Sequence, residues 1–136
     1  MPLTHLLDTS VLSQPLKDKP VESVLSRWES IGDPAICTSA ICLAELLHGL
    51  ETRQSEKYWR RFKHLLENRY PALPFDQATA SAYARMAAEL RRAGNTKPTV
   101  DLFIAATASQ NGLILVTLNE KDFAGIPGLI VENWAR

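Results

Sequence analysis

The chain opens on a short apolar run, Leu3 to Leu7, which stops at the acid and two hydroxyls of Asp8, Thr9 and Ser10. The run has no regular alternation of apolar and polar residues. That pattern favours a strand buried on both faces, as strands of a parallel sheet are. Open α/β folds place their ligands at the carboxyl ends of such strands. The sequence therefore predicts that Asp8 lies at the ligand-binding edge of a parallel sheet.

The rest of the chain alternates between helix and strand patterns. Strand patterns cover residues 35–38, 72–75, 113–116 and 129–131, and helix patterns cover 20–30, 40–50, 54–68, 77–92 and 99–110. This alternation predicts an α/β sandwich around a mainly parallel sheet. Ser39 and Thr99 are predicted N-caps, and Gly49 is a predicted C-terminal signal. A chain of 136 residues is expected to form one domain.

Acidic residues recur at places where a fold of this kind could bring them together. Glu45 interrupts an otherwise apolar helix, so we expect its side chain to be buried. An unpaired buried carboxylate costs on the order of several kcal/mol, so we also expect a partner that compensates its charge. Asp101 lies in the first turn of a helix, on the same face as Ile104. Asn119 and Asp122 follow the strand of residues 113–116.

Each acid also has a structural explanation. Asp8 could cap the turn that follows it, Glu45 could pair with a buried arginine, and Asp101 could complement its helix N-terminus. Together, however, several carboxylates at one sheet edge repel one another unless a cation shares them. Oxygen ligands without Cys or His suit Mg²⁺ or Mn²⁺, and these ions support hydrolysis of phosphodiesters by an activated water.

The charges are unevenly spread, although the net charge is zero. Six Lys or Arg lie in residues 51–70 and four in 85–97. These stretches could hold a polyanion, or they could be ordinary solvated helix faces. The chain shows no apolar run that could span a bilayer and no leader, so we expect a cytoplasmic protein with no membrane partner. Cys37 and Cys42 are expected to be small buried residues rather than a disulfide or zinc site.

Four short motifs occur in order along the chain: Leu7–Ser10, Ala44–Gly49, Asp101–Thr107 and Val116–Phe123. With these motifs the sequence resembles the PIN-domain ribonucleases, most closely the VapC-type toxins of type II toxin–antitoxin pairs. The resemblance covers essentially the whole chain. It implies a single PIN domain over residues 1–136, folded as a three-layer α/β/α sandwich.

The resemblance also implies a metal-dependent ribonuclease. Asp8, Glu45 and Asp101 would form the acidic site around Mg²⁺, with Mn²⁺ as an alternative. Asp8 and Asp101 would be direct ligands, and Glu45 would bind the metal or polarise its water. The bond hydrolysed would be an RNA phosphodiester.

Other positions of the motifs match supporting groups of the family. Thr9, Ser10 and Thr117 match hydroxyls that help to orient the site. The family's fourth acid falls on Asn119, where an amide replaces the carboxylate. Asp122 could take its place, or a second metal could bind poorly, so the number of metals stays open.

The family further implies partners: a VapB-like antitoxin that wraps the toxin, a homodimer of the toxin, and a toxin–antitoxin hetero-oligomer. The RNA target could be transfer, ribosomal or messenger RNA. Two other functions are weighed beside the nuclease. Asp8 could be the nucleophile of a phosphohydrolase, and the departure at Asn119 could mark a non-catalytic PIN-like binding module.

Overall fold

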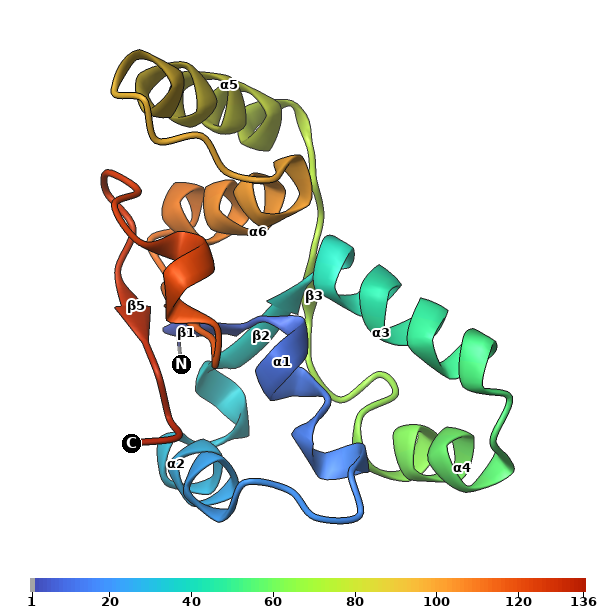
Figure 1. Ribbon diagram of the computed structural model, residues 1–136. Helices are drawn as coiled ribbons and strands as arrows, with labels where there is room; N and C mark the ends of the chain where they lie inside the picture. The colour runs from blue at the N-terminus through green and yellow to red at the C-terminus, as the bar shows by residue number, and fades with distance from the viewer. Residues whose placement is uncertain (1) are drawn as a thin grey trace.

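Five parallel strands form one central sheet in the computed structural model, which describes residues 2–136 (Figure 1). In spatial order the strands are β3 (Ala72–Leu73), β2 (Ile36–Ser39), β1 (His5–Leu7), β4 (Ile114–Val116) and β5 (Val131–Glu132). Every neighbouring pair is parallel. The predicted mainly parallel sheet is therefore confirmed.

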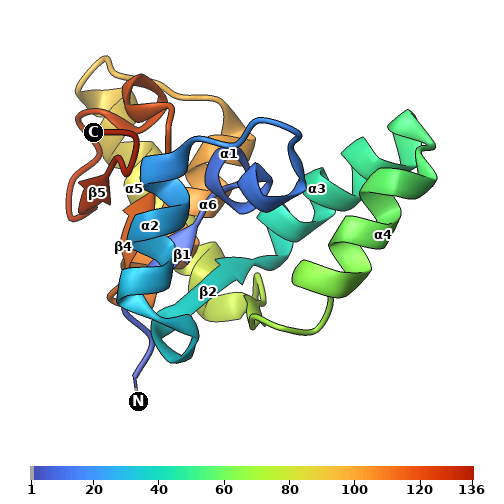
Figure 2. The ribbon, with the colours of Figure 1, turned by 90° about the horizontal axis from the view of Figure 1, so that it is seen from below.

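Helices cover both faces of this sheet, which confirms the three-layer sandwich. The helical elements are α1 (Thr9–Leu12), η1 (Gln14–Leu16), α2 (Glu22–Ile31), η2 (Asp33–Ala35), α3 (Ala40–Arg53), α4 (Glu56–Leu65), α5 (Gln77–Arg92), α6 (Thr99–Gln110) and η3 (Glu120–Phe123). α5 and α6 pack together over one face, α2 lies on the other, and α3 and α4 project to one side (Figures 1 and 2). In residues 2–136 no helix is both long and apolar enough to cross a bilayer.

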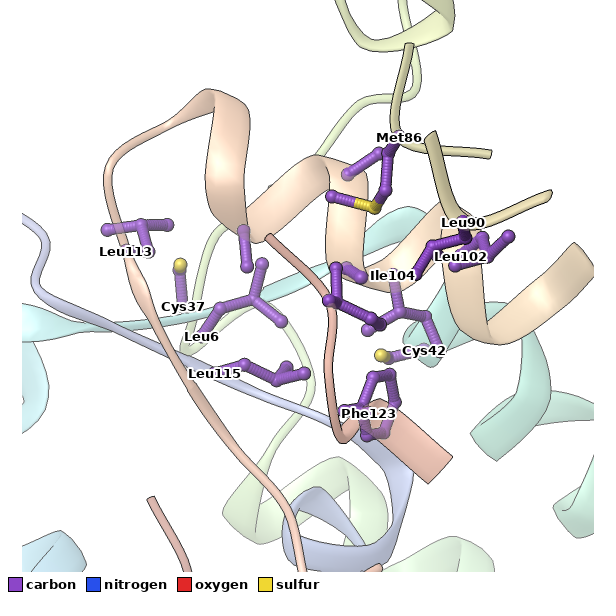
Figure 3. Close-up of a cluster of buried hydrophobic side chains, with 14 residues drawn as sticks. Leu6, Cys37, Cys42, Met86, Leu90, Leu102, Ile104, Leu113, Leu115 and Phe123 are labelled. Carbon is purple, nitrogen blue, oxygen red and sulfur yellow. The ribbon is translucent and has the colours of Figure 1, made fainter. Parts of the chain in front are cut away.

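The side chains of the strands belong to two separate halves of the core, one on each face of the sheet. Leu6 and Leu7 are adjacent and both fully buried, but they point to opposite faces of the sheet because successive side chains of a strand alternate. The half under α5 and α6 gathers Leu6, Cys37, Met86, Leu90, Ile104, Leu113, Leu115 and Phe123 (Figure 3). The other half gathers Leu7, Ile36, Val116, Val24, Trp28, Leu46, Phe62 and Trp134. Two apolar faces explain why the strand sequences show no polar alternation.

Helix α3 confirms one predicted boundary and overturns another. The Ser39 hydroxyl accepts a hydrogen bond from the Cys42 backbone N–H at 3.0 Å, as expected of an N-cap. The helix does not stop near Gly49, because Gly49 is not in the left-handed conformation that a helix-ending glycine adopts. It continues for another turn, and Gln54 closes it in the left-handed conformation.

The predicted N-cap of α6 was wrong by one residue. Pro98 is the capping residue, and Thr99 already lies within the helix. No side chain caps this N-terminus. Asp101 in the first turn therefore stands close to backbone N–H groups that lack helical partners, which favours a negative charge there.

Both cysteines are buried and free, as predicted. Burial raises the pKa of the Cys37 thiol to about 12 and that of Cys42 to about 11. Both side chains therefore stay protonated and act as small apolar groups.

Candidate active site

The central acid lies where the order of the strands reverses. From β1 the chain builds β2 and β3 on one side and returns to build β4 and β5 on the other. Asp8 follows β1 directly, and its backbone N–H donates to the carbonyl of Val116 in β4 at 3.0 Å. The carboxyl ends of β1 and β4 thus meet at the switch point of the sheet, where open α/β folds bind their ligands.

Hydrogen bonds hold the Asp8 carboxylate in one orientation. Its Oδ1 accepts from the Ser10 backbone N–H at 2.9 Å and from the Ser10 hydroxyl at 2.5 Å. Its Oδ2 accepts from the Thr117 hydroxyl at 2.6 Å. Asp8 is 5% exposed, and this burial raises the pKa of its carboxyl, while the hydrogen bonds from Ser10, Thr117 and the Val11 backbone act in the opposite direction. Asp8 also caps α1, so the structural explanation and a site role coexist.

The same two hydroxyls tie Asp8 to the segment after β4. The Ser10 hydroxyl accepts from the Leu118 backbone N–H at 3.0 Å. The Thr117 hydroxyl accepts from the Asn119 backbone N–H, also at 3.0 Å. Each hydroxyl therefore donates to the acid and accepts from the loop. A shift of the loop would disturb the carboxylate directly.

Glu45 differs from the sequence prediction. It is exposed, not buried in an apolar surface, because α3 turns this face outward. In residues 2–136 it forms no ion pair, so the alternative that it pairs with a buried arginine is wrong. Instead the Thr9 hydroxyl donates to Glu45 Oε1 at 2.6 Å. This bond links α1 to α3 and holds the carboxylate toward the end of β1.

The pKa of Asp101 is raised by its burial and by the charges of the other acids. The residue is half-buried in the first turn of α6. Burial raises the pKa of its carboxyl most, and the negative charges of Asp122, Glu45 and Asp8 raise it further, in that order. The positive charge of Lys97 acts in the opposite direction. The charges of acids from three other segments of the chain therefore reach the carboxyl of Asp101.

The two remaining predicted site residues are exposed: Asn119 precedes η3, and Asp122 lies within it. The Asp122 backbone N–H donates to the carbonyl of Asn119 at 3.0 Å, which makes the turn that carries both. Both side chains line a surface depression of about 370 Å³ next to Leu118. Asp122 acts on Asp101 through its charge, whereas the amide of Asn119 carries none.

The acids do not form a ready-made metal cage. In the part of the chain that the structure describes, no three His, Cys, Asp or Glu side chains lie close enough together to hold one ion among them. Asp8 Oδ2 takes one hydrogen bond and keeps a lone pair, and the Thr9 bond occupies only one oxygen of Glu45. Mg²⁺ needs only one or two carboxylates when it keeps its waters. The donor set fits a hydrated Mg²⁺ of that kind.

Lys97 is a base beside these acids that was not among the predicted site residues. Lys97 counted only as one base among several in residues 85–97, yet its ammonium donates to the Lys121 carbonyl in η3 at 3.1 Å. A lysine four residues before Asp101 could have drawn attention to it. Where its side chain reaches depends on how two loops approach each other, which no local pattern reveals.

Comparisons with known proteins agree with one another. Residues 5–129 match a family model described as the PIN domain. A Shigella flexneri protein described as a tRNA(fMet)-specific endonuclease VapC is 32% identical, over 98% of this chain and 99% of that protein. The crystal structure of DNA-bound VapBC from Salmonella typhimurium superposes with a TM-score of 0.82 at 32% identity, covering 97% of this chain and 98% of that one. FitAcB from Neisseria gonorrhoeae gives 0.85 at 30% identity, with 96% and 98% covered.

Proposed function

The chain belongs to the PIN-domain family and to its VapC-type toxin ribonucleases, and from this membership we propose that it is a Mg²⁺-dependent endoribonuclease paired with a VapB-like antitoxin. The observation that carries the proposal is that three other acids, from three other segments of the chain, lie near enough to Asp101 for their charges to raise the pKa of its carboxyl. Uncompensated carboxylates in one place are costly, and a divalent cation relieves that cost.

The chain's own residues supply the rest of the chemistry. A divalent cation in this place lowers the pKa of water and neutralises charge on the phosphoryl oxygens. Asp8 and Asp101 would bind it, with Asp8 held in position by the hydroxyls of Ser10 and Thr117. Glu45 would accept the proton of the attacking water on Oε2, since Thr9 holds Oε1.

We assign the fourth acidic role to Asp122 rather than to Asn119. Both side chains line the same surface depression. Only Asp122 carries a charge, and that charge is the largest Coulombic influence on the carboxyl of Asp101. Asn119 would then help to position Thr117 through its backbone N–H, which donates to the hydroxyl of Thr117.

Substrate and partners follow from the relatives. The Shigella flexneri relative is described as specific for tRNA(fMet), so we propose initiator tRNA as the substrate. Structural neighbours described as VapBC and FitAcB support a hetero-oligomer of toxin and antitoxin, and we propose a homodimer of the toxin within it. The single domain over residues 1–136 and the cytoplasmic location stay predictions.

The test is cleavage of initiator tRNA by the purified protein with Mg²⁺, with Mn²⁺ and with EDTA. Asp8→Asn and Asp101→Asn should each lower the cleavage rate by about a hundredfold or more, since each removes a carboxylate that the reaction needs. Glu89→Gln is the matched control, because Glu89 is an exposed acid on α5 and its change to an amide should leave the rate intact. Cleavage that persists in EDTA or in the Asp8→Asn variant would contradict the proposal.

The two other functions make different predictions. An Asp8 nucleophile would be labelled by an acyl phosphate, and we expect no labelling, because Asp8 is buried and bonded through both oxygens. A non-catalytic module would bind no metal at the acids. Calorimetry should instead show Mg²⁺ binding that is lost in Asp101→Ala.

A further inference from the structure

Two loops are joined beside the acids. The segment between α5 and α6 carries Asn95 and Lys97, and the segment that includes η3 carries Lys121 and Ala124. The Lys97 ammonium donates to the carbonyl of Lys121 at 3.1 Å, and the Asn95 side-chain amide donates to the carbonyl of Ala124 at 3.4 Å. One loop leads into the helix of Asp101, and the other carries the turn of Asp122. The bonds therefore span the site from one acid-bearing segment to the other.

A glycine allows the loops to approach this closely. Gly125 has a φ of +76°, and a Cβ placed on it would lie 2.7 Å from Asn95 Nδ2. Real Cβ atoms do not lie that close to another heavy atom, so a larger residue would displace the end of the Asn95 side chain. The bond from Asn95 to the Ala124 carbonyl thus depends on the missing side chain at Gly125, and it is one of the two bonds that join the loops.

The ammonium of Lys97 keeps capacity to bind a ligand. It has three N–H donors, and the Lys121 carbonyl uses one. In residues 2–136 it forms no ion pair with a carboxylate, in contrast to Lys57 and Arg61, which both bind Asp18. Lys97 is half-buried, and it lies four residues before Asp101, in the loop that leads into α6. A cation that is held by backbone, rather than neutralised by an acid, stands at the edge of the acidic site.

RNA needs a cation at this place. The acids repel the phosphates of an approaching strand, and the metal compensates only at the phosphate that reacts. A neighbouring phosphate is repelled by the same acids, and the metal does not offset that repulsion. From these observations we propose that Lys97 binds an RNA phosphate adjoining the scissile one, as a substrate-binding residue of the nuclease. The inference rests on the proposed function.

The experiment compares Lys97→Met with Lys97→Arg, and Lys19→Met is the matched control. Lys19 is an exposed base between η1 and α2, outside both basic stretches, and it makes no hydrogen bond in the described residues. We expect Lys97→Met to raise KM for RNA by about tenfold at low salt, with kcat within about twofold, as for loss of one charged contact made equally in ground and transition states. The slope of log(kcat/KM) against log salt should become shallower by about 0.7 to 0.9, the value for one phosphate contact. Lys97→Arg should retain most of the affinity, and Lys19→Met should match the unmodified chain.

Two further readouts separate this inference from a structural effect and from the proposed function. Mg²⁺ binding to Lys97→Met without RNA should be unchanged or tighter, because a repelling charge has been removed. RNA affinity measured by fluorescence anisotropy in an Asp8→Asn background should fall by the same factor as KM rises. Unchanged KM and salt slope, or weaker Mg²⁺ binding, would overturn the role of Lys97 while leaving the nuclease intact. An unmodified chain that does not cleave RNA would overturn the nuclease itself.

Discussion

The hydroxyl of Thr117 offers a sharp test of how the fold holds its central acid. Thr117 is 0% exposed. It donates to Asp8 Oδ2 at 2.6 Å and accepts from the Asn119 backbone N–H at 3.0 Å. Thr117→Val keeps nearly the same shape and removes both bonds. The substitution therefore probes the hydrogen bonds without opening a cavity.

The expected loss of unfolding free energy in Thr117→Val follows from the negative charge of Asp8, which accepts the hydrogen bond. A hydrogen bond to a charged group contributes about 1.5–3 kcal/mol to stability, against about 1 kcal/mol for a neutral pair. The second bond, from the N–H of Asn119, joins two neutral groups, so its loss does not depend on the charge of Asp8. We expect the free energy of unfolding of Thr117→Val to be lower by about 1.5–3 kcal/mol at neutral pH.

The loss should depend on pH with a definite sign. The bond from Thr117 lowers the pKa of Asp8, whose folded pKa burial has already raised. Without the bond, the folded variant keeps its proton on Asp8 to a higher pH than the unmodified fold does. Above both folded pKa values the full loss is present, whereas below them Asp8 is neutral in both proteins and only about 1 kcal/mol remains. The difference in unfolding free energy should therefore shrink as the pH falls from about 8 to about 4.

The assay is urea unfolding followed by tryptophan fluorescence, in EDTA, at both ends of that pH range. Thr117→Ser is the control, since it keeps the hydroxyl and loses one buried methyl. It should cost about 1 kcal/mol, equally at both pH values. The reasoning would be refuted if the Val variant lost the same amount at both pH values, or if the Ser variant showed the same pH dependence.

Three further substitutions test other parts of the structure. Asp101→Asn should abolish cleavage yet raise the melting temperature in EDTA at neutral pH. The folded pKa of Asp101 is raised, so its charge lowers stability as the pH climbs through that pKa, and the Asn variant should show a flatter pH profile in calorimetry. Gly125→Ala should raise KM for RNA more than Gly128→Ala does. Both glycines have a φ of +76°, but only at Gly125 does the new Cβ meet Asn95; equal kinetics would contradict the proposed contact. Trp134→Ala should lower the free energy of unfolding by about 3–5 kcal/mol, because this side chain is 1% exposed; a loss below about 1 kcal/mol in chemical denaturation would argue against its place in the core.

The sequence alone determined the layers and the edge of the sheet at which the acids gather. Buried parallel strands show as apolar runs, since Leu6 and Leu7 both face a core. Helix 77–92 was predicted with the bounds of α5 because its alanines favour the helix, and in the structure Asp76 begins it with a capping box. Asp8 could be placed at the end of β1 because it directly follows the apolar run.

Only the tertiary structure decided how these residues meet. The Thr117 hydroxyl bonds to Asp8 across 109 positions of the chain, and the Lys97 ammonium bonds to η3 across 24. The partner of Glu45 is the hydroxyl of Thr9, 36 positions away, and not an arginine. Periodicity and capping are local, so they reveal which face of an element is apolar and where it begins. Side-chain pairs between distant segments depend on strand register and on how closely loops pack, and those are set by the whole core at once.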